Sequence, residues 1–372
     1  MTSSAFDLAV AGGGAIGLAC AWRAAGRGLR TVVVDAGDPG AWQVAAGMLA
    51  PVAEAQVGDA TAVELGLRAA RGFGAFVDEL SEDVGHRTTG TLLVARDRDE
   101  AEALERELAF RRELGLEVER LRPSQARRAE PALAPTVRLA LDVPGDHSVD
   151  PRRLVAALAT AFERAGGTIR RARVAGVALE GDARVAGLRL DDGEVIRADR
   201  VLVATGTGPI EAPDAVPVRP VKGQVLRLRD PRGDRPHPPL IERTVRGPDA
   251  YLVPRADGTY VLGATMEERG IDTAPTAGGV YELIRDISEV VPGVLELELE
   301  EVRAGLRPAT PDNLPAIGHG TVDGLLWAAG HFRNGILLAP LTAGLIAAAA
   351  AGEPLPDWAA VADPRRFAKV PA

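Results

Sequence analysis

Cysteine and lysine are nearly missing from this 372-residue sequence, which has one cysteine, Cys20, and two lysines, Lys222 and Lys369. A single cysteine excludes a disulfide within the chain and a metal site built from several thiolates. The five histidines lack the spacing of metal ligands, so we expect no metal site. The formal net charge of −9 leaves little positive surface for phosphate contacts, so a nucleic-acid partner is not expected.

Long hydrophobic runs are also scarce in this chain. The most apolar stretch, residues 336–351, contains Pro340 and Thr342 and is shorter than the ~20 residues that a membrane-spanning helix needs. It is predicted to be a buried helix, so stable membrane insertion is not expected. The first residues show no basic region or cleavage site of a secretory signal, and the scarcity of cysteine fits a reducing compartment. We therefore expect a cytoplasmic protein that acts on a small molecule.

The start of the sequence contains a pattern that predicts a β-α-β unit. Residues 6–11 form an apolar run of strand length and are followed by three glycines. Residues 15–25 form an alanine-rich helical segment, and residues 31–34 form a β-branched strand that ends at Asp35. A strand, a glycine turn, a helix and a second strand in this order are typical of a dinucleotide-binding fold.

The glycine motif has a physical reason at each position in such a fold. Gly12 permits the tight turn, Gly14 lets the backbone approach a pyrophosphate, and Gly17 lets the helix pack against the strand. Asp35 can accept hydrogen bonds from ribose hydroxyls. A glycine-rich turn without a ligand is the alternative, and the motif alone leaves FAD and NAD open. The strand end at residues 204–206 (Ala-Thr-Gly) adds a second place where the chain can pass close to a dinucleotide.

Further helices and strands are predicted along the rest of the chain. Helical patterns cover residues 97–115 and 151–166, and a buried strand covers residues 201–204. From residue 216 to residue 261 the pattern changes to short alternating strands, which favours a mainly antiparallel sheet. The chain from Pro354 onward is predicted to be a surface tail.

Several segments far apart in the chain together resemble one family. They are the N-terminal glycine motif, Ala46-Gly47-Met48-Leu49, Tyr251-Leu252-Val253-Pro254-Arg255, Gly263-Ala264-Thr265-Met266, Ala304-Gly305-Leu306-Arg307-Pro308 and the run from Gly330 to Pro340. With these motifs the chain resembles the FAD-dependent D-amino-acid oxidase family over nearly its whole length, and within it most closely the glycine oxidases of the thiamine pathway. The resemblance implies oxidative deamination of glycine, sarcosine or a small D-amino acid to an oxo acid, ammonia and hydrogen peroxide, with dioxygen as the acceptor. It also implies a role in thiamine biosynthesis and a homo-oligomer, since related glycine oxidases are homotetramers.

The pattern and the resemblance together predict an α/β fold with two domains. A discontinuous Rossmann-like FAD-binding domain is expected beside an α+β substrate domain built on a mainly antiparallel sheet. The predicted boundaries are residues 1–82, 145–212 and 305–362 for the FAD-binding domain, 83–144 and 213–304 for the substrate domain, and 363–372 for a tail.

The resemblance implies a non-covalent FAD. Residues 46–48 would lie on one side of the isoalloxazine ring and the loop that starts at His331 on the other, with the positive end of the following helix directed at the flavin pyrimidine ring. Cys20 lies far in the sequence from the places where related sarcosine oxidases tether their flavin. The cofactor-binding residues expected on this basis are Gly12, Gly14, Ala15, Ile16, Gly17, Asp35, Ala36, Ala46, Gly47, Met48, Val174, Thr205, Gly206, His331, Phe332, Arg333, Asn334, Gly335, Ile336 and Leu337.

The resemblance also implies which residues bind the substrate. Arg307 would grip its carboxylate, because a guanidinium fork matches a carboxylate in two bonds. The alternative is a surface arginine in an ion pair. Tyr251 and Arg333 are the other expected catalytic and substrate-binding residues, with a core tyrosine and a flavin-supporting arginine as alternatives. Met266 and Met48 are expected in the wall of the substrate pocket.

The chain departs from the family pattern at two places. Residues 41–44 (Ala-Trp-Gln-Val) stand where serine and threonine often precede the Ala-Ala-Gly segment, so we do not count on hydroxyl contacts to the FAD phosphates there. Asp249 stands where a close glycine oxidase is expected to have histidine. A dehydrogenase of the same fold that passes electrons to a quinone, a tRNA-modifying relative and a non-catalytic FAD-binding protein stay open as alternatives.

Overall fold

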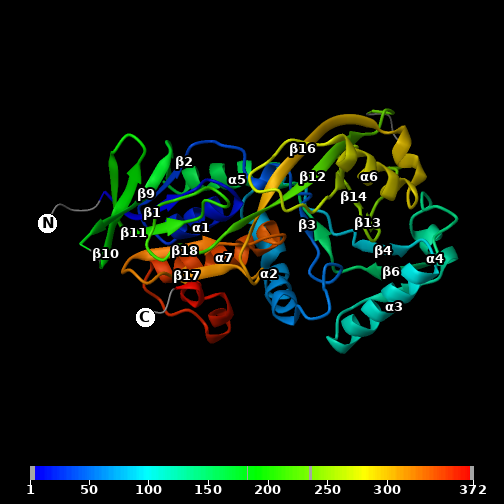
Figure 1. Cartoon of the computed structure of the whole chain (residues 1–372), viewed down its shortest axis with the longest axis horizontal. Coiled ribbons are helices and arrows are strands. Elements are labelled where there is room, and N and C mark those ends of the chain that lie inside the picture. Colours follow the sequence, from blue (N-terminus) through cyan, green and yellow to red (C-terminus); the bar gives the residue numbers. More distant parts are fainter. Residues whose placement is uncertain (1–4, 182, 234–236, 369–372) are drawn as a thin grey trace.

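The computed structural model describes residues 5–181, 183–233 and 237–368, and Figure 1 shows two sheets side by side along its long axis. The first four residues of the predicted FAD-binding domain, Lys369 and the last three residues of the predicted tail lie outside the described residues. The first sheet has the strand order β17-β18-β11-β1-β2-β8, and β10 and β9 continue from β11. Its strands are β1 (Phe6–Ala11), β2 (Thr31–Asp35), β8 (Thr168–Arg171), β9 (Val174–Glu180), β10 (Arg184–Leu190), β11 (Val195–Val203), β17 (Ala316–His319) and β18 (Leu325–Ala329).

The central strands of the first sheet are parallel and buried on both faces. β1 pairs in parallel with β2 and β11, and β11 pairs in parallel with β18. Leu8 and Val10 of β1 face one apolar cluster with the helices, while Ala9 and Ala11 face another with the β9-β10 hairpin. Such strands read as continuous apolar runs because neither face meets water.

Four helices cover the face of this sheet to which Leu8 and Val10 point. They are α1 (Ala15–Gly26), α2 (Ala60–Asp78), α5 (Pro151–Arg164) and α7 (Gly335–Ala350). α5 begins where the Asp150 side chain accepts hydrogen bonds from the backbone N–H groups of Arg152 and Arg153, which caps the helix. α7 is apolar all round and packs against both α1 and α2, as the prediction of a buried helix requires. Within the described part of the chain, every helix is too short or too polar to cross a bilayer.

The second sheet has the order β16-β12-β15-β14-β13-β4-β6-β5 and is antiparallel except for the parallel pair of β13 and β4. Its strands are β4 (Thr91–Ala95), β5 (Glu119–Leu121), β6 (Leu139–Val143), β12 (Arg219–Arg229), β13 (Thr244–Arg246), β14 (Tyr251–Pro254), β15 (Thr259–Gly263) and β16 (Glu298–Ala309). The helices α3 (Arg98–Glu113), α4 (Pro123–Ala129) and α6 (Ala277–Ser288) pack on it. The long strands β12 and β16 reach back toward the first sheet (Figure 1).

The predicted α/β fold with a mainly antiparallel second sheet is confirmed. The first strand, the glycine turn, the first helix and the second strand lie within one residue of their predicted ends. The helices α2 and α6, by contrast, were not predicted, and the exact domain boundaries stay a prediction.

The expected surface tail from Pro354 onward is wrong for residues 357–367. The short 3-10 helices η3 (Asp357–Ala362) and η4 (Pro364–Phe367) fold back onto the first domain. Ala359 and Ala362 are buried in the same apolar cluster as α7, because their small side chains leave room for close packing.

Candidate functional site

Residues from both sheets surround one cavity of about 2160 Å3. It lies at the carboxyl ends of the parallel strands β1, β2 and β11, where α/β sheets bind their ligands, and extends to β12 and β16. Of the predicted site residues, Gly17, Asn334 and Leu337 do not line it. Those that do are Gly12, Gly14, Ala15, Ile16, Asp35, Ala36, Ala46, Gly47, Met48, Val174, Thr205, Gly206, Tyr251, Met266, Arg307, His331, Phe332, Arg333, Gly335 and Ile336.

The three motif glycines face different surroundings. Gly12 has φ +104°, and a Cβ there would lie 2.5 Å from the carbonyl oxygen of Ala204. A Cβ on Gly17 would lie 1.9 Å from the carbonyl oxygen of Gly12, so α1 packs this closely only with glycine at this position. A Cβ on Gly14 would meet no protein atom nearer than Trp42 Cδ1 at 3.5 Å. The protein itself therefore leaves room at Gly14, on the cavity side.

The amino end of α1 presents free donors to the cavity. Its N-cap, Gly14, has no side chain to accept hydrogen bonds, and the first turn contains no acidic residue. The first hydrogen bond within the helix joins Leu18 N to Gly14 O at 3.0 Å. The N–H groups of Ala15, Ile16 and Gly17 therefore have no acceptor in the helix, an arrangement that suits a pyrophosphate.

Asp35 is held rigidly at the end of β2. Its carboxylate accepts a hydrogen bond from Gly13 N at 2.7 Å and another from Gly37 N at 2.6 Å. The Arg171 guanidinium lies 3.6 Å away. Two backbone donors fix the orientation of the carboxylate and leave other lone pairs for hydroxyl groups in the cavity.

A second helix also opens on the cavity. α7 follows the loop 330–334, and its N-cap, Asn334, makes no side-chain cap. Phe332 takes φ +46° and donates its N–H to Pro308 O at 2.8 Å, which holds the loop against β16. His331 is buried, its Nε2 lies 2.9 Å from Thr342 Oγ1, and burial lowers its pKa to about 3. His331 is therefore neutral near pH 7. Gly335 and Ile336, in the first turn of α7, line the cavity, and the N–H groups of a first helical turn have no acceptor within the helix.

The segment from Ala41 to Met48 forms another wall. Its first part is the 3-10 helix η1 (Ala41–Gln43), and the Trp42 ring lies beside Gly14. Gly47 has φ +73°, and a Cβ there would lie 2.0 Å from Val149 O. The buried Arg255 donates to the carbonyl oxygen of Ala46, which supports this wall from behind.

These features fit FAD. A dinucleotide needs an anion site at a helix amino end, an acid near the ribose and a long cavity, and the first domain provides all three in one place. The second uncapped helix, α7, adds a positive dipole end at the far part of the same cavity. Cys20, the single cysteine of the chain, is fully buried in α1 and does not line the cavity, which fits a non-covalent cofactor.

Arg307 presents a guanidinium fork that has no carboxylate partner among the described residues. It lies on β16 opposite Val221 of β12, and a Cβ on Gly223 would be 2.3 Å from its Nη1. Nη1 donates to Lys222 O at 3.3 Å and to Thr265 O at 3.1 Å. Among the described residues no carboxylate forms an ion pair with Arg307, and burial lowers its pKa. The expected alternative of a surface ion pair is therefore not what the structure contains.

Glu54 was not among the predicted site residues, yet it organises the other cations. It accepts hydrogen bonds from Arg333 Nη2 at 2.9 Å and from Arg246 Nη1 at 3.0 Å. Although burial raises the pKa of Glu54, the charges of Arg333 and Arg246 hold it below its usual value. With Arg307 beside them, three cations face one anion, so this end of the cavity carries excess positive charge.

The remaining predicted residues lie around Arg307. Burial raises the pKa of Tyr251, so the phenol is protonated at neutral pH, and its hydroxyl interacts with Arg307. Met48 is half-buried in the wall, whereas Met266 is 59% exposed at the rim. Asp249 also lies at the rim, 3.6 Å from Arg96, instead of pointing at the arginine cluster.

The turn that carries Glu54 is held by two buried ionisable side chains, Asp146 and Arg111. The Asp146 carboxylate accepts hydrogen bonds from Val52 N at 3.3 Å and Ala53 N at 3.0 Å. Arg111 of α3 donates to the carbonyl oxygens of Val52 and Ala53, both at 2.9 Å. Both side chains are almost completely buried, so they fix the backbone just before Glu54.

Asp146 is expected to make the stability depend on pH. Burial raises its pKa to about 7, although the two backbone donors oppose the shift. A raised pKa in the folded state stabilises the protein below the unfolded pKa of about 3.9, and this contribution is lost as the pH rises through about 7. Urea unfolding from pH 4.5 to 8.5 should show wild type losing a few kcal/mol relative to Asp146→Asn, whose amide does not titrate. A difference between the two proteins that does not change with pH would contradict the expectation.

A sequence model of one protein family, described as FAD dependent oxidoreductase, matches residues 7–349. The chain is 34% identical to the glycine oxidase of Geobacillus kaustophilus, over 92% of this chain and 92% of that protein. It is 32% identical to the hydrogen cyanide synthase subunit HcnC of Pseudomonas aeruginosa, over 92% and 91%. It is 33% identical to the bifunctional protein ThiO/ThiG of Synechocystis sp. over 91% of this chain, and it spans about half (51%) of that protein.

The fold is similar to a solved structure as well. The crystal structure of the glycine oxidase from Geobacillus kaustophilus superposes with a TM-score of 0.86 and 31% identity, over 96% of this chain and 98% of that chain. The similarity therefore extends over both sheets and the cavity between them, and it agrees with FAD as the cofactor.

Proposed function

The chain belongs to the FAD dependent oxidoreductase family, and from this premise we propose that it oxidises the amine of a small amino acid. Glycine is the first candidate, followed by sarcosine and small D-amino acids, with dioxygen as the electron acceptor. Similarity to a glycine oxidase over more than nine tenths of both chains supports the substrate class. The single observation that carries the proposal is the Arg307 guanidinium in the cavity, which has no carboxylate partner among the described residues.

Arg307 can bind the substrate carboxylate. The Arg307 guanidinium is half-buried and bonded to two carbonyl oxygens and the Tyr251 hydroxyl, and its other donors stay free for a carboxylate. The cations Arg246 and Arg333, which share Glu54, add an attractive field for an anion. The protonated Tyr251 beside Arg307 can donate a further hydrogen bond and cover the bound acid.

FAD would be held by the α1 amino end, Asp35, residues 46–48 and the α7 amino end, and when bound it would accept a hydride, which carries both electrons, from the substrate Cα. The chain's own residues supply positioning and electrostatics. None of the groups described next to Arg307 is suited to act as a base near neutral pH. Glu54 is an anion bound by two arginines, and the pKa of Tyr251 is raised. The amine is therefore expected to react in its neutral form, after giving its proton to solvent.

The overall reaction balances with water and dioxygen. The substrate C–N bond is oxidised to an imine, and dioxygen takes up the two electrons as hydrogen peroxide. Water then hydrolyses the imine to an oxo acid and ammonia, or to an oxo acid and methylamine where sarcosine is the substrate. The similarity to a hydrogen cyanide synthase subunit makes cyanide a second candidate product of glycine. Its formation requires a second two-electron oxidation, of the imine, and release of the carboxyl group as carbon dioxide. A quinone stays open as an alternative electron acceptor.

One experiment tests this function. The purified, FAD-loaded protein is mixed without oxygen with glycine, sarcosine or D-alanine, and loss of the flavin absorbance is followed. Air is then admitted, and hydrogen peroxide, the released amine and cyanide are measured. Bleaching followed by peroxide and an equal amount of ammonia, or of methylamine where sarcosine is the substrate, is the expected result. Failure of all three amines to bleach the flavin would refute the proposal, and bleaching with slow reoxidation by air but fast reoxidation by a quinone would favour the dehydrogenase.

The role in thiamine biosynthesis, the homotetramer and the cytoplasmic location stay predictions. The similarity to the bifunctional protein ThiO/ThiG supports the first of these predictions. This chain corresponds to about half (51%) of that protein.

A further inference from the structure

The loop of residues 264–276 forms one rim of the cavity. It joins β15 to α6, and most of its residues are exposed, with Ile271 at 83%. Met266, Glu267, Arg269 and Thr273 of this loop line the cavity. An exposed loop of this length is usually held only at its ends, so its attachment to the cavity floor has to come from specific contacts.

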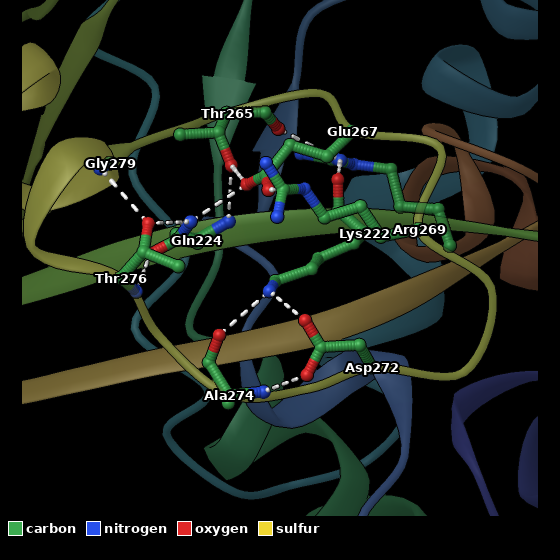
Figure 2. A network of polar contacts seen from close by, with 10 residues as sticks. Lys222, Gln224, Thr265, Glu267, Arg269, Asp272, Ala274, Thr276 and Gly279 are labelled. Atoms are coloured by element: carbon green, nitrogen blue, oxygen red, sulfur yellow. Dashed lines mark hydrogen bonds and ion pairs between the residues drawn. The ribbon is translucent and has the colours of Figure 1, made fainter.

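Lys222 of β12 provides such a contact. Its side chain is completely buried, and its Nζ donates to Asp272 Oδ2 at 2.6 Å and to the carbonyl oxygen of Ala274 at 2.7 Å (Figure 2). Asp272 is on the exposed side of the loop, and its hydrogen bond with Lys222 lowers its pKa. The ammonium group thus bonds the second half of the loop, at Asp272 and Ala274, to the strand β12.

The near half of the loop is bound to the same strand. Lys222 N donates to Glu267 O at 2.8 Å, and Glu267 N donates to Lys222 O at 2.9 Å. The buried Gln224, two residues along β12, bonds Glu267 Oε1 at 2.7 Å and both accepts from and donates to Thr276 (Figure 2). Lys222 and Gln224 therefore hold the loop at both of its halves.

The same contacts reach the carboxylate clamp. Arg307 Nη1 donates to the carbonyl oxygens of Lys222 and Thr265, one on the strand and one on the loop. If the loop moved away from β12, one of the two acceptors that orient Arg307 would move with it. The position of the loop and the aim of Arg307 are thus coupled through a short chain of bonds.

The choice of lysine at this position is informative. Almost every basic residue of the chain is an arginine, and Lys222 is the only lysine among the described residues. A compact ammonium can bond two oxygens from a fully enclosed space, whereas a planar guanidinium is larger and would have to displace its neighbours.

We propose that Lys222 is a positioning residue that latches the loop 264–276 over the cavity and so restricts the substrates to small amines. The statement about substrates rests on the proposed amine oxidation, whereas the latch itself does not. With the latch released, the rim that carries Met266 can open, and amino acids with longer N-substituents can enter. Arg307 loses part of its orientation at the same time, so glycine binds more weakly.

The test compares Lys222→Met with Arg219→Gln in the FAD-loaded protein. Lys222→Met removes the charge and leaves every loop residue unchanged. Arg219→Gln is the matched control, since it breaks the surface ion pair between β12 and Glu268 of the same loop, and Arg219 does not line the cavity. Trypsin cleavage after the exposed Arg269, followed by mass spectrometry, reports the loop without reference to activity.

Cleavage after Arg269 is expected to be at least about tenfold faster in Lys222→Met and unchanged in the control. KM for glycine should rise about tenfold with kcat changed less than about threefold, and the preference for glycine over N-butylglycine should fall about tenfold. Asp272→Asn should move the kinetic values in the same direction, and Lys222→Arg should restore them only partly. An unchanged cleavage rate in Lys222→Met, or an equal increase in Arg219→Gln, overturns the latch. If wild type oxidises no amine, the proposed function fails, and the cleavage rates still decide on the latch.

Discussion

Replacing Arg307 by methionine is expected to lower kcat/KM for glycine by roughly 10²- to 10³-fold, because the carboxylate of the bound substrate would lose its charged partner. Removing one member of a buried ion pair costs about 3–5 kcal/mol, and the nearby Arg246 and Arg333 should recover part of that loss. Methionine keeps most of the side-chain volume over Gly223, so the strands β12 and β16 should stay paired. Steady-state kinetics and the flavin absorption spectrum measure the two effects separately.

Arg307→Lys is the informative companion of this variant. It keeps the positive charge but loses the planar fork, so it should recover only a minor part of the activity. Arg219→Gln, at the surface of the neighbouring strand β12, should leave kcat/KM unchanged within about twofold. If Arg307→Met leaves the KM for glycine as it is, Arg307 does not bind the carboxylate, and the substrate assignment loses its main support.

Features encoded by neighbouring residues were predictable from the sequence. The β1-α1-β2 unit follows from an apolar run, three glycines and an alanine-rich segment, all within the first 35 residues. The motif also implies why residue 17 is glycine, because a Cβ at this position would collide with the carbonyl oxygen of Gly12. The loop 330–334 was likewise recognisable, because its residues are contiguous.

Features that depend on pairing between distant strands were not predictable. Glu54 is an unremarkable acid in the sequence, and its role appears only when β13 brings Arg246 and the α7 loop brings Arg333 to within 3.0 Å of it. The latch at Lys222 similarly needs the β12 register and the return of the loop to Asp272. No local periodicity encodes either contact, because each joins segments whose spacing is set by the folded sheet.

The helix α6 was missed because its glycines hide it in the sequence. α6 starts with Ala277-Gly278-Gly279, and glycines so close to a helix start argue against a helix in the sequence. In the fold a Cβ on Gly279 would lie 2.5 Å from Gln224 Nε2, so the glycine allows the helix to approach β12. Tertiary packing here outweighs helix propensity.

Gly14→Ala is expected to weaken FAD binding at least about 100-fold, or about 2.7 kcal/mol, while leaving the FAD-free protein folded. Inside the protein the added methyl would meet nothing closer than 3.5 Å, so it clashes only with a pyrophosphate drawn up to the α1 amino end. Alanine caps a helix less well than glycine, but it also reduces the entropy of the unfolded chain, so the free energy of unfolding should change by less than about 1 kcal/mol. Titration of the FAD-free protein with FAD and urea unfolding measure the two quantities.

Two other glycines of the same helix separate the possible causes of such a result. Gly26 has no atom within 4 Å of its Cβ position, so Gly26→Ala should leave FAD binding unchanged and stabilise the protein by about 0.5–1 kcal/mol. Gly17→Ala should destabilise even the FAD-free protein, because its methyl would overlap Gly12 O. If Gly14→Ala binds FAD as wild type does, the pyrophosphate does not approach α1 here. If Gly14→Ala is destabilised as much as Gly17→Ala, the added methyl does not fit in the space beside Trp42. Weaker FAD binding would then follow from the loss of stability and would not test the glycine motif.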